Sequence, residues 1–141
     1  MNIDEARTHA QRLGSTVYIG TVTASAFANI TPIVMAWPDE RIYMATGAKS
    51  FKVRDLAKNP NVTLHWPVSQ ATNFDQLKIR GKAEVLTDPA SRARLWKAFD
   101  YDLAAFFGTP DSAELCYIAL TPERIVMELA MGAGGRETWK A

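Results

Sequence analysis

The chain has 141 residues, of which 48% are hydrophobic and 22% charged, with 16 Lys and Arg against 15 Asp and Glu. This balance is typical of one compact domain with a buried core and is unlike that of a disordered chain. The net charge of +1 gives no chain-wide attraction to nucleic acid, and no segment has the ~20 apolar residues that cross a bilayer. We therefore predict a single domain over residues 1–141, without a nucleic-acid or membrane partner.

The first 13 residues carry Ile3, Ala6, Ala10 and Leu13, a spacing that predicts a short amphipathic helix. This stretch is charged and has no hydrophobic signal region. The only cysteine, Cys116, excludes an intramolecular disulfide and lies in an apolar run, which predicts a buried thiol. These features predict a cytoplasmic protein.

The middle of the chain reads as short strands separated by turns. Residues 77–86 show the clearest alternation, with Leu77 and Ile79 on one face and Lys78 and Arg80 on the other. Asn59-Pro60 closes a stretch of helical character. We predict strands over 15–23, 30–37, 41–46, 62–66 and 77–86, and a helix over 49–59, with the first three strands forming an antiparallel meander.

Beyond residue 87, Asp88-Pro89 predicts a helix start and Gly108 its end. Leu95, Phe99, Leu103 and Phe106 recur at helical spacing, so we predict one amphipathic helix that packs these side chains on the sheet. Residues 116–122 and 124–130 then predict a last hairpin. A glycine-rich tail follows over 131–141.

Six or seven short strands with one substantial helix predict a mainly β (α+β) fold, an antiparallel barrel with peripheral helices. The strands over 15–23 and 30–37 are apolar on both faces. One face fills the barrel, and the other needs a cover. A second copy of the chain is the simplest cover, so we predict a homodimer.

The most suggestive short segment runs from Thr46 through Gly47 to Arg54, between a strand and a helix. A helix N-terminus offers free backbone N–H groups and a partial positive charge. Thr46 and Ser50 add hydroxyls, and Lys49 and Lys52 add charge, so a phosphomonoester would fit there. The alternative is that Ser50 only caps the helix and the lysines are solvated.

Other catalytic patterns are absent from the sequence. His9 and His65 have no Cys or carboxylate at ligand spacing, so we predict no metal site. The chain has no GxSxG, GxGxxG or HExxH motif and no evident general acid or base. If the protein is an enzyme, a bound cofactor is expected to supply the chemistry.

The segments RIYMATGAKSFKVRDLAKNPNVTLHW (41–66) and QLKIRGKAEVL (76–86) resemble the pyridoxamine 5'-phosphate oxidase-like FMN-binding split-barrel family. The similarity spans most of residues 15–130 and is greatest to the short, general-stress-protein-like members. It implies a six- to seven-stranded split barrel that works as a homodimer, with FMN at the dimer interface and a small-molecule redox partner.

Within this resemblance, Thr46, Ser50 and Lys52 match family positions that hold the FMN phosphate and ribityl chain. Gln76 matches a family glutamine that reaches the flavin from the strand before Gly81. A further match covers the strand whose backbone edges the isoalloxazine ring, and its residues are Ile33, Val34 and Met35.

The chain also departs from true pyridoxamine 5'-phosphate oxidases. Thr31, Ile33 and Met35 stand where these enzymes have basic residues, and no histidine follows His65. We therefore expect a flavoprotein, an oxidoreductase or general stress protein, that does not oxidise vitamin B6. Arg136 and Trp139 either fold over the flavin or lie in a disordered tail.

Three alternatives remain open for the function. A deazaflavin (F420) reductase would use the same basic turn for its phosphate. Haem has only His9 and His65 as axial ligands. A cofactor-free dimer would bind a ligand or another protein on the same barrel.

Overall fold

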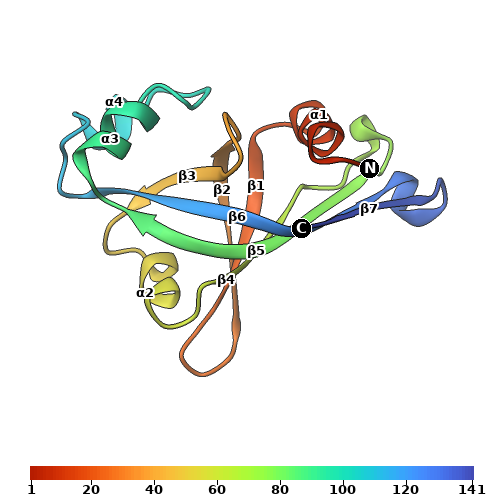
Figure 1. Cartoon of the computed structure of the whole chain (residues 1–141), viewed down its shortest axis with the longest axis horizontal. Helices are drawn as coiled ribbons and strands as arrows, with labels where there is room; N and C mark the ends of the chain where they lie inside the picture. The colour runs from red at the N-terminus through yellow and green to blue at the C-terminus, as the bar shows by residue number, and fades with distance from the viewer.

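Seven antiparallel strands form one sheet in the order β3-β2-β1-β4-β5-β6-β7, and a further pairing of β3 with β6 closes six of them into a barrel (Figure 1). The computed structural model describes residues 1–141. The strands are β1 Thr16–Val22, β2 Ala28–Ala36, β3 Ile42–Gly47, β4 Asn61–His65, β5 Gln76–Leu86, β6 Leu115–Glu128 and β7 Arg136–Lys140. The predicted antiparallel barrel and the opening meander are confirmed.

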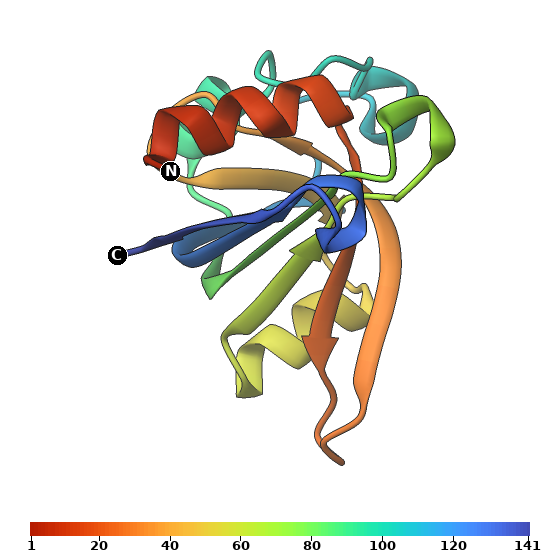
Figure 2. The same cartoon turned by 90° about the vertical axis from the view of Figure 1, so that its right-hand side faces the viewer.

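The helices lie around the barrel. They are α1 Ile3–Leu13, α2 Phe51–Lys58, α3 Pro89–Leu95 and α4 Ala104–Phe107, with single 3₁₀ turns η1 Gln70–Thr72 and η2 Leu129–Gly132. Figure 2 shows α1 across one end of the barrel and α2 at the other end, beside the β1–β2 hairpin. None of these helices combines the length and the hydrophobicity that a membrane crossing requires.

The barrel interior holds the main core, a cluster of 19 buried residues. The alternation predicted for residues 77–86 places Leu77 and Ile79 in it, while Arg80 stays exposed. A second cluster of 7 buried residues lies outside the barrel wall, where Leu95 and Leu103 pack against the strands. Cys116 is buried, as predicted.

The single helix predicted from Asp88 to Gly108 is wrong, because the structure has two short helices there. Asp88 caps α3, accepting a 2.9 Å hydrogen bond from the Ser91 N–H, as predicted. After Leu95 the chain leaves the helix. Asp100 accepts a hydrogen bond from the Ser15 hydroxyl at 2.6 Å, and Asp102 accepts one from the Ala104 N–H at 3.0 Å, at the start of α4. The bond of Asp102 is of the local kind by which Asp side chains compete with a continuous helix. The predicted packing of all four apolar side chains also fails, because Phe106 is 72% exposed.

The predicted last hairpin over 116–122 and 124–130 is also wrong. Both segments belong to one continuous strand, β6, which pairs with β5 along its length. Pro122 does not end this strand, because it lies at a bulge opposite Gly81, where a missing N–H is tolerated. On its other edge β6 pairs with β3 over residues 115–120 and with the tail, which forms β7, over residues 124–128.

Candidate functional site

The barrel is split between β2 and β3. Their ladder consists of two pairs, Met35↔Met44 and Ala36↔Tyr43, whereas β1 pairs with β2 from Val34 back to Ala28. Residues 28–34 of β2 therefore have no strand partner on the side facing β3, and we call this stretch the open edge of β2. Free backbone groups on such an edge are available to a ligand.

The orientation of the backbone along the open edge follows from one hydrogen bond. The Met35 N–H donates to the Ser15 C=O at 2.8 Å and so faces β1. Neighbouring residues of a strand point their N–H groups to opposite sides, so the Val34 N–H faces the split. Pro32 also faces the split and has no N–H, which suits an open edge. Val34 is thus the backbone donor nearest the point where the β2–β3 ladder ends.

Across the split, β3 runs into α2 through a tight turn that gathers hydroxyl groups. Thr46, at the end of β3, is 7% exposed, and its hydroxyl lies 3.4 Å from that of Ser50. Ser50 is the N-cap of α2, the role that the alternative to a phosphate site gave it, and accepts a 3.5 Å hydrogen bond from the Val53 N–H. The N–H of Ser50 itself donates to the Gly47 C=O at 3.0 Å. This geometry leaves the first amides of α2 at the surface beside two hydroxyls.

The charge at the start of α2 is uniformly positive. The first turn of α2 has no acidic residue, and Lys49, Lys52 and Arg54 take part in none of the six ion pairs of the structure. Burial raises the pKa of the Cys116 thiol to about 11, although the charges of Arg92 and Lys52 act in the opposite direction. The start of α2 therefore carries positive charge that no acidic side chain of its first turn neutralises.

A buried carboxylate fixes α2 to the two strands of the meander. Asp55 accepts hydrogen bonds from the hydroxyl of Thr21 on β1 at 2.7 Å and from the amide of Asn29 on β2 at 3.3 Å. Because Asn29 lies on the open edge, these bonds set the distance between that edge and the helix. The start of α2 is therefore held in a fixed place relative to β2.

The structure brings six of the seven predicted site residues to the split. Counting outward from the Met35↔Met44 pair, Ile33 and Thr46 are equally far along their strands, on opposite sides of the split. The six residues are Ile33, Val34, Met35, Thr46, Ser50 and Lys52. The side chains of Ile33 and Met35 pack in the main core, so the β2 segment offers its backbone.

Gln76 is the exception. It begins β5, which β1 and β4 separate from β2, and its amide donates to the Glu128 carboxylate at 3.1 Å. The same carboxylate accepts from the Arg136 guanidinium at 2.8 Å. Within one protomer, Gln76 is thus part of a β5–β6–β7 network and not of the split.

The tail is ordered as a strand, so Arg136 and Trp139 have fixed positions. Trp139 is opposite Ile125 in the ladder and packs against the main core. Arg136 pairs with Glu128 on the opposite face of the sheet. Neither residue reaches the split, because β7 continues the edge of β6 beyond the start of β3, whereas the split opens toward the end of β3.

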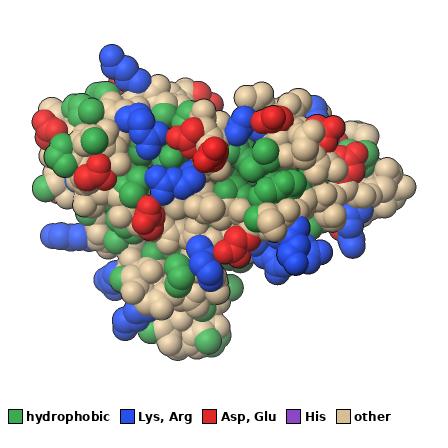
Figure 3. Space-filling model, in the orientation of Figure 1, with side chains coloured by type: hydrophobic (Ala, Val, Ile, Leu, Met, Phe, Trp, Pro, Cys, Tyr) green, Lys and Arg blue, Asp and Glu red, His purple; other side chains and the backbone are tan.

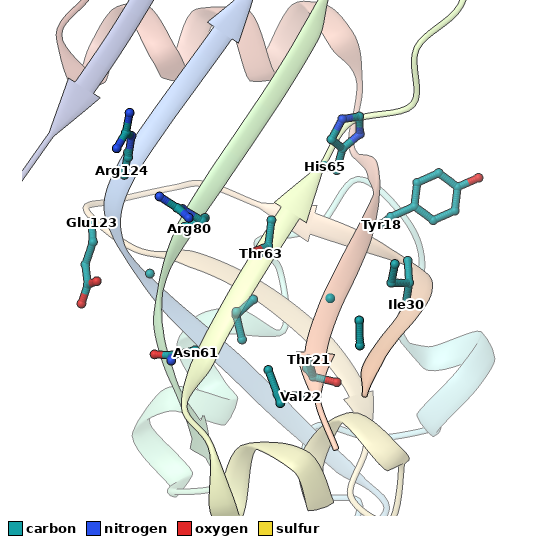
Figure 4. Close-up of a pocket in the computed structure, with 14 residues that line it drawn as sticks. Tyr18, Thr21, Val22, Ile30, Asn61, Thr63, His65, Arg80, Glu123 and Arg124 are labelled. Atoms are coloured by element: carbon teal, nitrogen blue, oxygen red, sulfur yellow. The ribbon is translucent and has the colours of Figure 1, made fainter. Parts of the chain in front are cut away.

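A groove that the sequence did not suggest crosses the outer face of β1, β4 and β5 (Figure 4). Its volume is about 740 Å³, and His65 is half-buried in its lining. The other residues that shape it include Tyr18, Gly20, Ile30, Thr63, Arg80 and Arg124. In the sequence, this groove is foreshadowed only by a glycine in the β-branched strand β1 and by the basic residues of β5. Only the strand register shows that these residues lie on one face, and the register cannot be derived from the sequence.

The comparisons with known proteins agree with this architecture. A family model described as pyridoxamine 5'-phosphate oxidase matches residues 7–127. No curated protein matches the chain in sequence. General Stress Protein 26 from Bacillus anthracis str. Sterne has a similar structure, with 20% identity, a TM-score of 0.77 and 100% of both chains covered.

Two further solved structures show the same fold. A pyridoxamine 5'-phosphate oxidase-related, FMN-binding protein from Nostoc punctiforme PCC 73102 has 14% identity and a TM-score of 0.74, covering 99% of this chain and 94% of its own. A heme-binding protein from Mycobacterium smegmatis has 17% identity and a TM-score of 0.76, covering 96% of this chain and 56% of its own. With the family match over residues 7–127, these observations show that the chain belongs to the pyridoxamine 5'-phosphate oxidase family, on a split-barrel fold.

Proposed function

We propose that this protein is a flavoprotein that binds FMN noncovalently at the split between β2 and β3, beside the start of α2, and acts as an oxidoreductase. The observation that carries the proposal is the start of α2, directly after β3, where three cations without ion pairs gather beside the hydroxyls of Thr46 and Ser50. Family membership supports it, and one relative with this fold is described as FMN binding. A neutral or acidic turn at this position would not suit a phosphate.

The residues fit the parts of FMN separately. Ser50, Lys52 and the first amides of α2 suit the terminal phosphate, because they provide hydroxyl, charge and free N–H groups together. Thr46 suits the ribityl chain, and the Val34 N–H suits a carbonyl or ring nitrogen at the rim of the flavin. The bound flavin would supply hydride or electron transfer, while the chain supplies position and polarity.

The proposed assembly is a homodimer. Three apolar side chains of the β1–β2 hairpin are strongly exposed: Tyr18 at 43%, Ile30 at 65% and Phe27 at 72%. Exposed apolar surface of this kind favours a partner. Gln76 lies away from the split of its own protomer, so a role of Gln76 toward the flavin requires the split of a second protomer.

The test is a visible absorption spectrum of the purified protein after incubation with FMN and desalting, with light scattering on the same sample. We expect a retained flavin spectrum near one FMN per chain and a mass twice the 15.6 kDa of the chain. A colourless protein would contradict FMN binding. Retention of F420 or haem in the same assay would assign the split to that cofactor instead, and a monomeric mass would contradict the homodimer.

A further inference from the structure

A cavity of about 380 Å³ lies between α1, the end of β2 with the turn that follows it, and the loop between α3 and α4, and we call it the α1 cavity. In the whole chain, four buried side-chain nitrogen or oxygen atoms have no hydrogen-bond partner. Two of them, Arg7 Nε and Trp37 Nε1, belong to residues that line this cavity. A buried donor without an acceptor is costly, so each one calls for an explanation. Two such donors at one cavity indicate an acceptor that is not part of the chain.

The other buried tryptophan of the main core shows that the fold can satisfy an indole N–H. Trp66 Nε1 donates to the Gly14 C=O at the end of α1, at 2.9 Å. Trp37 lies in the same core and is only 8% exposed, yet its Nε1 has no acceptor. An unpaired indole is therefore not a general feature of this core. It occurs at the tryptophan that lines the α1 cavity.

Arg7 is held in place by contacts that leave its Nε free. One terminal nitrogen donates to the Asp39 C=O at 2.7 Å and the other to the Asp4 carboxylate at 3.1 Å. The guanidinium carbon lies 5.4 Å from the centre of the Trp37 ring. Asp4 is the only ion-pair partner of Arg7 and is 81% exposed, so water screens its charge. The guanidinium is thus fixed, charged and close to the second unpaired donor.

A neighbouring hollow shares Arg7, but its other cations are already neutralised. Arg94 pairs with Asp39 at 3.0 Å, and Arg41 pairs with Glu84 at 2.7 Å. Figure 3 shows basic and acidic side chains interspersed over β3, between α3 and α1. An anion in that hollow would have to displace these carboxylates. The unpaired donors direct an anion to the α1 cavity instead.

The opposite end of the α1 cavity is acidic. Asp100 lies there and accepts the 2.6 Å hydrogen bond from the Ser15 hydroxyl. Ser15 follows the end of α1, so the helix separates it from Arg7 by roughly 10 Å. The lining also includes the small apolar residues Ala10, Ala36, Pro38 and Ala98. One carboxylate therefore fits at the Arg7 end, whereas Asp100 repels a second one at the other.

We propose that the α1 cavity binds a small monocarboxylate with a compact apolar body. Its carboxylate would accept hydrogen bonds from Arg7 Nε and Trp37 Nε1, and bonds between charged groups are the stronger kind. The volume of about 380 Å³ lies in the usual range of small-molecule sites. Trp37 follows the last pair of the β2–β3 ladder on its turn side, whereas the split opens at the other end of that ladder. The exposed apolar residues assigned to the homodimer do not line this cavity.

The experiment follows the indole N–H resonances of the four tryptophans by heteronuclear NMR while sodium benzoate is added to protein incubated with FMN. Trp37→Phe identifies the Trp37 signal. We expect benzoate to shift this signal and to leave that of Trp66 unchanged, because Trp66 keeps its bond to Gly14. Neutral benzamide, which has nearly the same shape, is expected to bind at least about 10-fold more weakly. A Trp37 signal that neither compound moves, or that both move with equal affinity, would overturn the proposal.

The flavin absorbance of the same samples separates this site from the split. Retained FMN with a shifted Trp37 signal supports two distinct sites. Release of FMN by benzoate would place the probe in the split and overturn the proposal. A colourless protein whose Trp37 signal still responds to benzoate would uphold the α1 cavity and contradict only FMN binding.

Two variants and two controls locate the site. Arg7→Gln removes the charge and the Nε donor, and Trp37→Phe removes the Nε1 donor but keeps an aromatic ring. Lys58→Gln on α2 and Trp139→Phe on β7 make the same kinds of exchange outside the cavity. The first two are expected to weaken benzoate about 10-fold or more, measured on the benzoate resonances, and the controls to have no effect. Undiminished binding in both cavity variants would overturn the proposal. Trp37→Phe breaks no hydrogen bond of the protein, so it keeps the test valid if Arg7→Gln fails to fold.

Discussion

The hydroxyl of Thr21 donates a 2.7 Å hydrogen bond to the carboxylate of Asp55, and both side chains are buried at the end of the barrel. This bond joins the interior face of β1 to the helix whose first turn carries Ser50 and Lys52. The position of the candidate phosphate site therefore depends on a contact that lies behind it, inside the barrel.

Replacing Asp55 by alanine tests this dependence. The variant leaves the Thr21 hydroxyl buried without its partner, which costs about 1–3 kcal/mol in the free energy of unfolding. We expect urea denaturation to show this loss and FMN affinity to fall with it. Asp111→Ala, at an exposed loop residue without hydrogen bonds, serves as the control. An unfolding midpoint equal to the wild type would contradict the structural role of Asp55.

The phosphate site makes a separate prediction. Lys52→Ala combined with Ser50→Ala is expected to weaken FMN roughly 10- to 100-fold, because hydrogen bonds to charged groups contribute about 1.5–3 kcal/mol. Lys58→Ala, in the exposed last turn of the same helix, leaves the affinity unchanged. Fluorescence titration of FMN measures both. Undiminished affinity in the double variant would sink the assignment, and Lys52→Ala alone separates the lost charge from the lost helix cap.

Asp75 gives a pH-dependent prediction. The Ala130 N–H, which donates to this carboxylate at 2.9 Å, lowers the pKa of Asp75; burial opposes this effect, and Arg12 at 2.9 Å adds to it. A carboxyl with a lowered folded-state pKa stabilises the protein fully above its unfolded pKa of about 3.9. That stabilisation is lost as the pH falls from there through the folded-state pKa.

Thermal melting of wild type and Asp75→Asn at pH 6 and at pH 3 checks this. We expect the variant to melt lower at pH 6 and the difference to shrink at pH 3, because below about pH 3.9 the unfolded chain takes up a proton that the folded Asp75 carboxylate resists. Asp111→Asn is the exposed control, with no change at either pH. A difference that stays constant with pH would show that the charge of Asp75 does not stabilise the fold.

Gly81 lies at the bulge, where a side chain has no room, and Gly20, in the regular strand β1, serves as the comparison. Gly81→Ala pushes a methyl group into the Thr121 backbone and is expected to destabilise the protein by about 1–3 kcal/mol or more. Gly20→Ala has space and is expected to raise stability by roughly 0.5–1 kcal/mol. Urea denaturation compares the two, and equal effects would refute the difference between the sites.

Local patterns in the sequence were sufficient for most elements. Ser50 and Asp88 each caps the helix it was predicted to cap, because a cap depends on the few residues next to it. The helical spacing from Leu95 to Phe106 was misleading. Two short helices and the bent loop between them bring Leu95 and Leu103 into one buried cluster. Both leucines are buried as predicted, although the continuous helix that was predicted to carry them does not form.

The candidate sites differ in how far the sequence could predict them. Thr46, Ser50 and Lys52 are neighbours in the chain, so their grouping is a local property. Arg80 and Arg124 are brought opposite each other only by the β5–β6 register, which includes a bulge. Pro122 indicated a turn within what is in fact the continuous strand β6. The bulge adds one residue to β6, and the alternation of polar and apolar residues in neither strand reveals it.

The continuity of β6 has a consequence for synthesis of the protein. This strand pairs with β3 and β5 and later receives β7, and its contact with β3 joins Thr46 to Cys116 across 70 positions. Strands β1 to β5 therefore emerge from the ribosome as a curved sheet with two unsatisfied edges, and the barrel closes only when the last fifth of the chain has been released. Because pairings over such separations form slowly, a pause or truncation before residue 115 would leave an aggregation-prone open sheet of five strands.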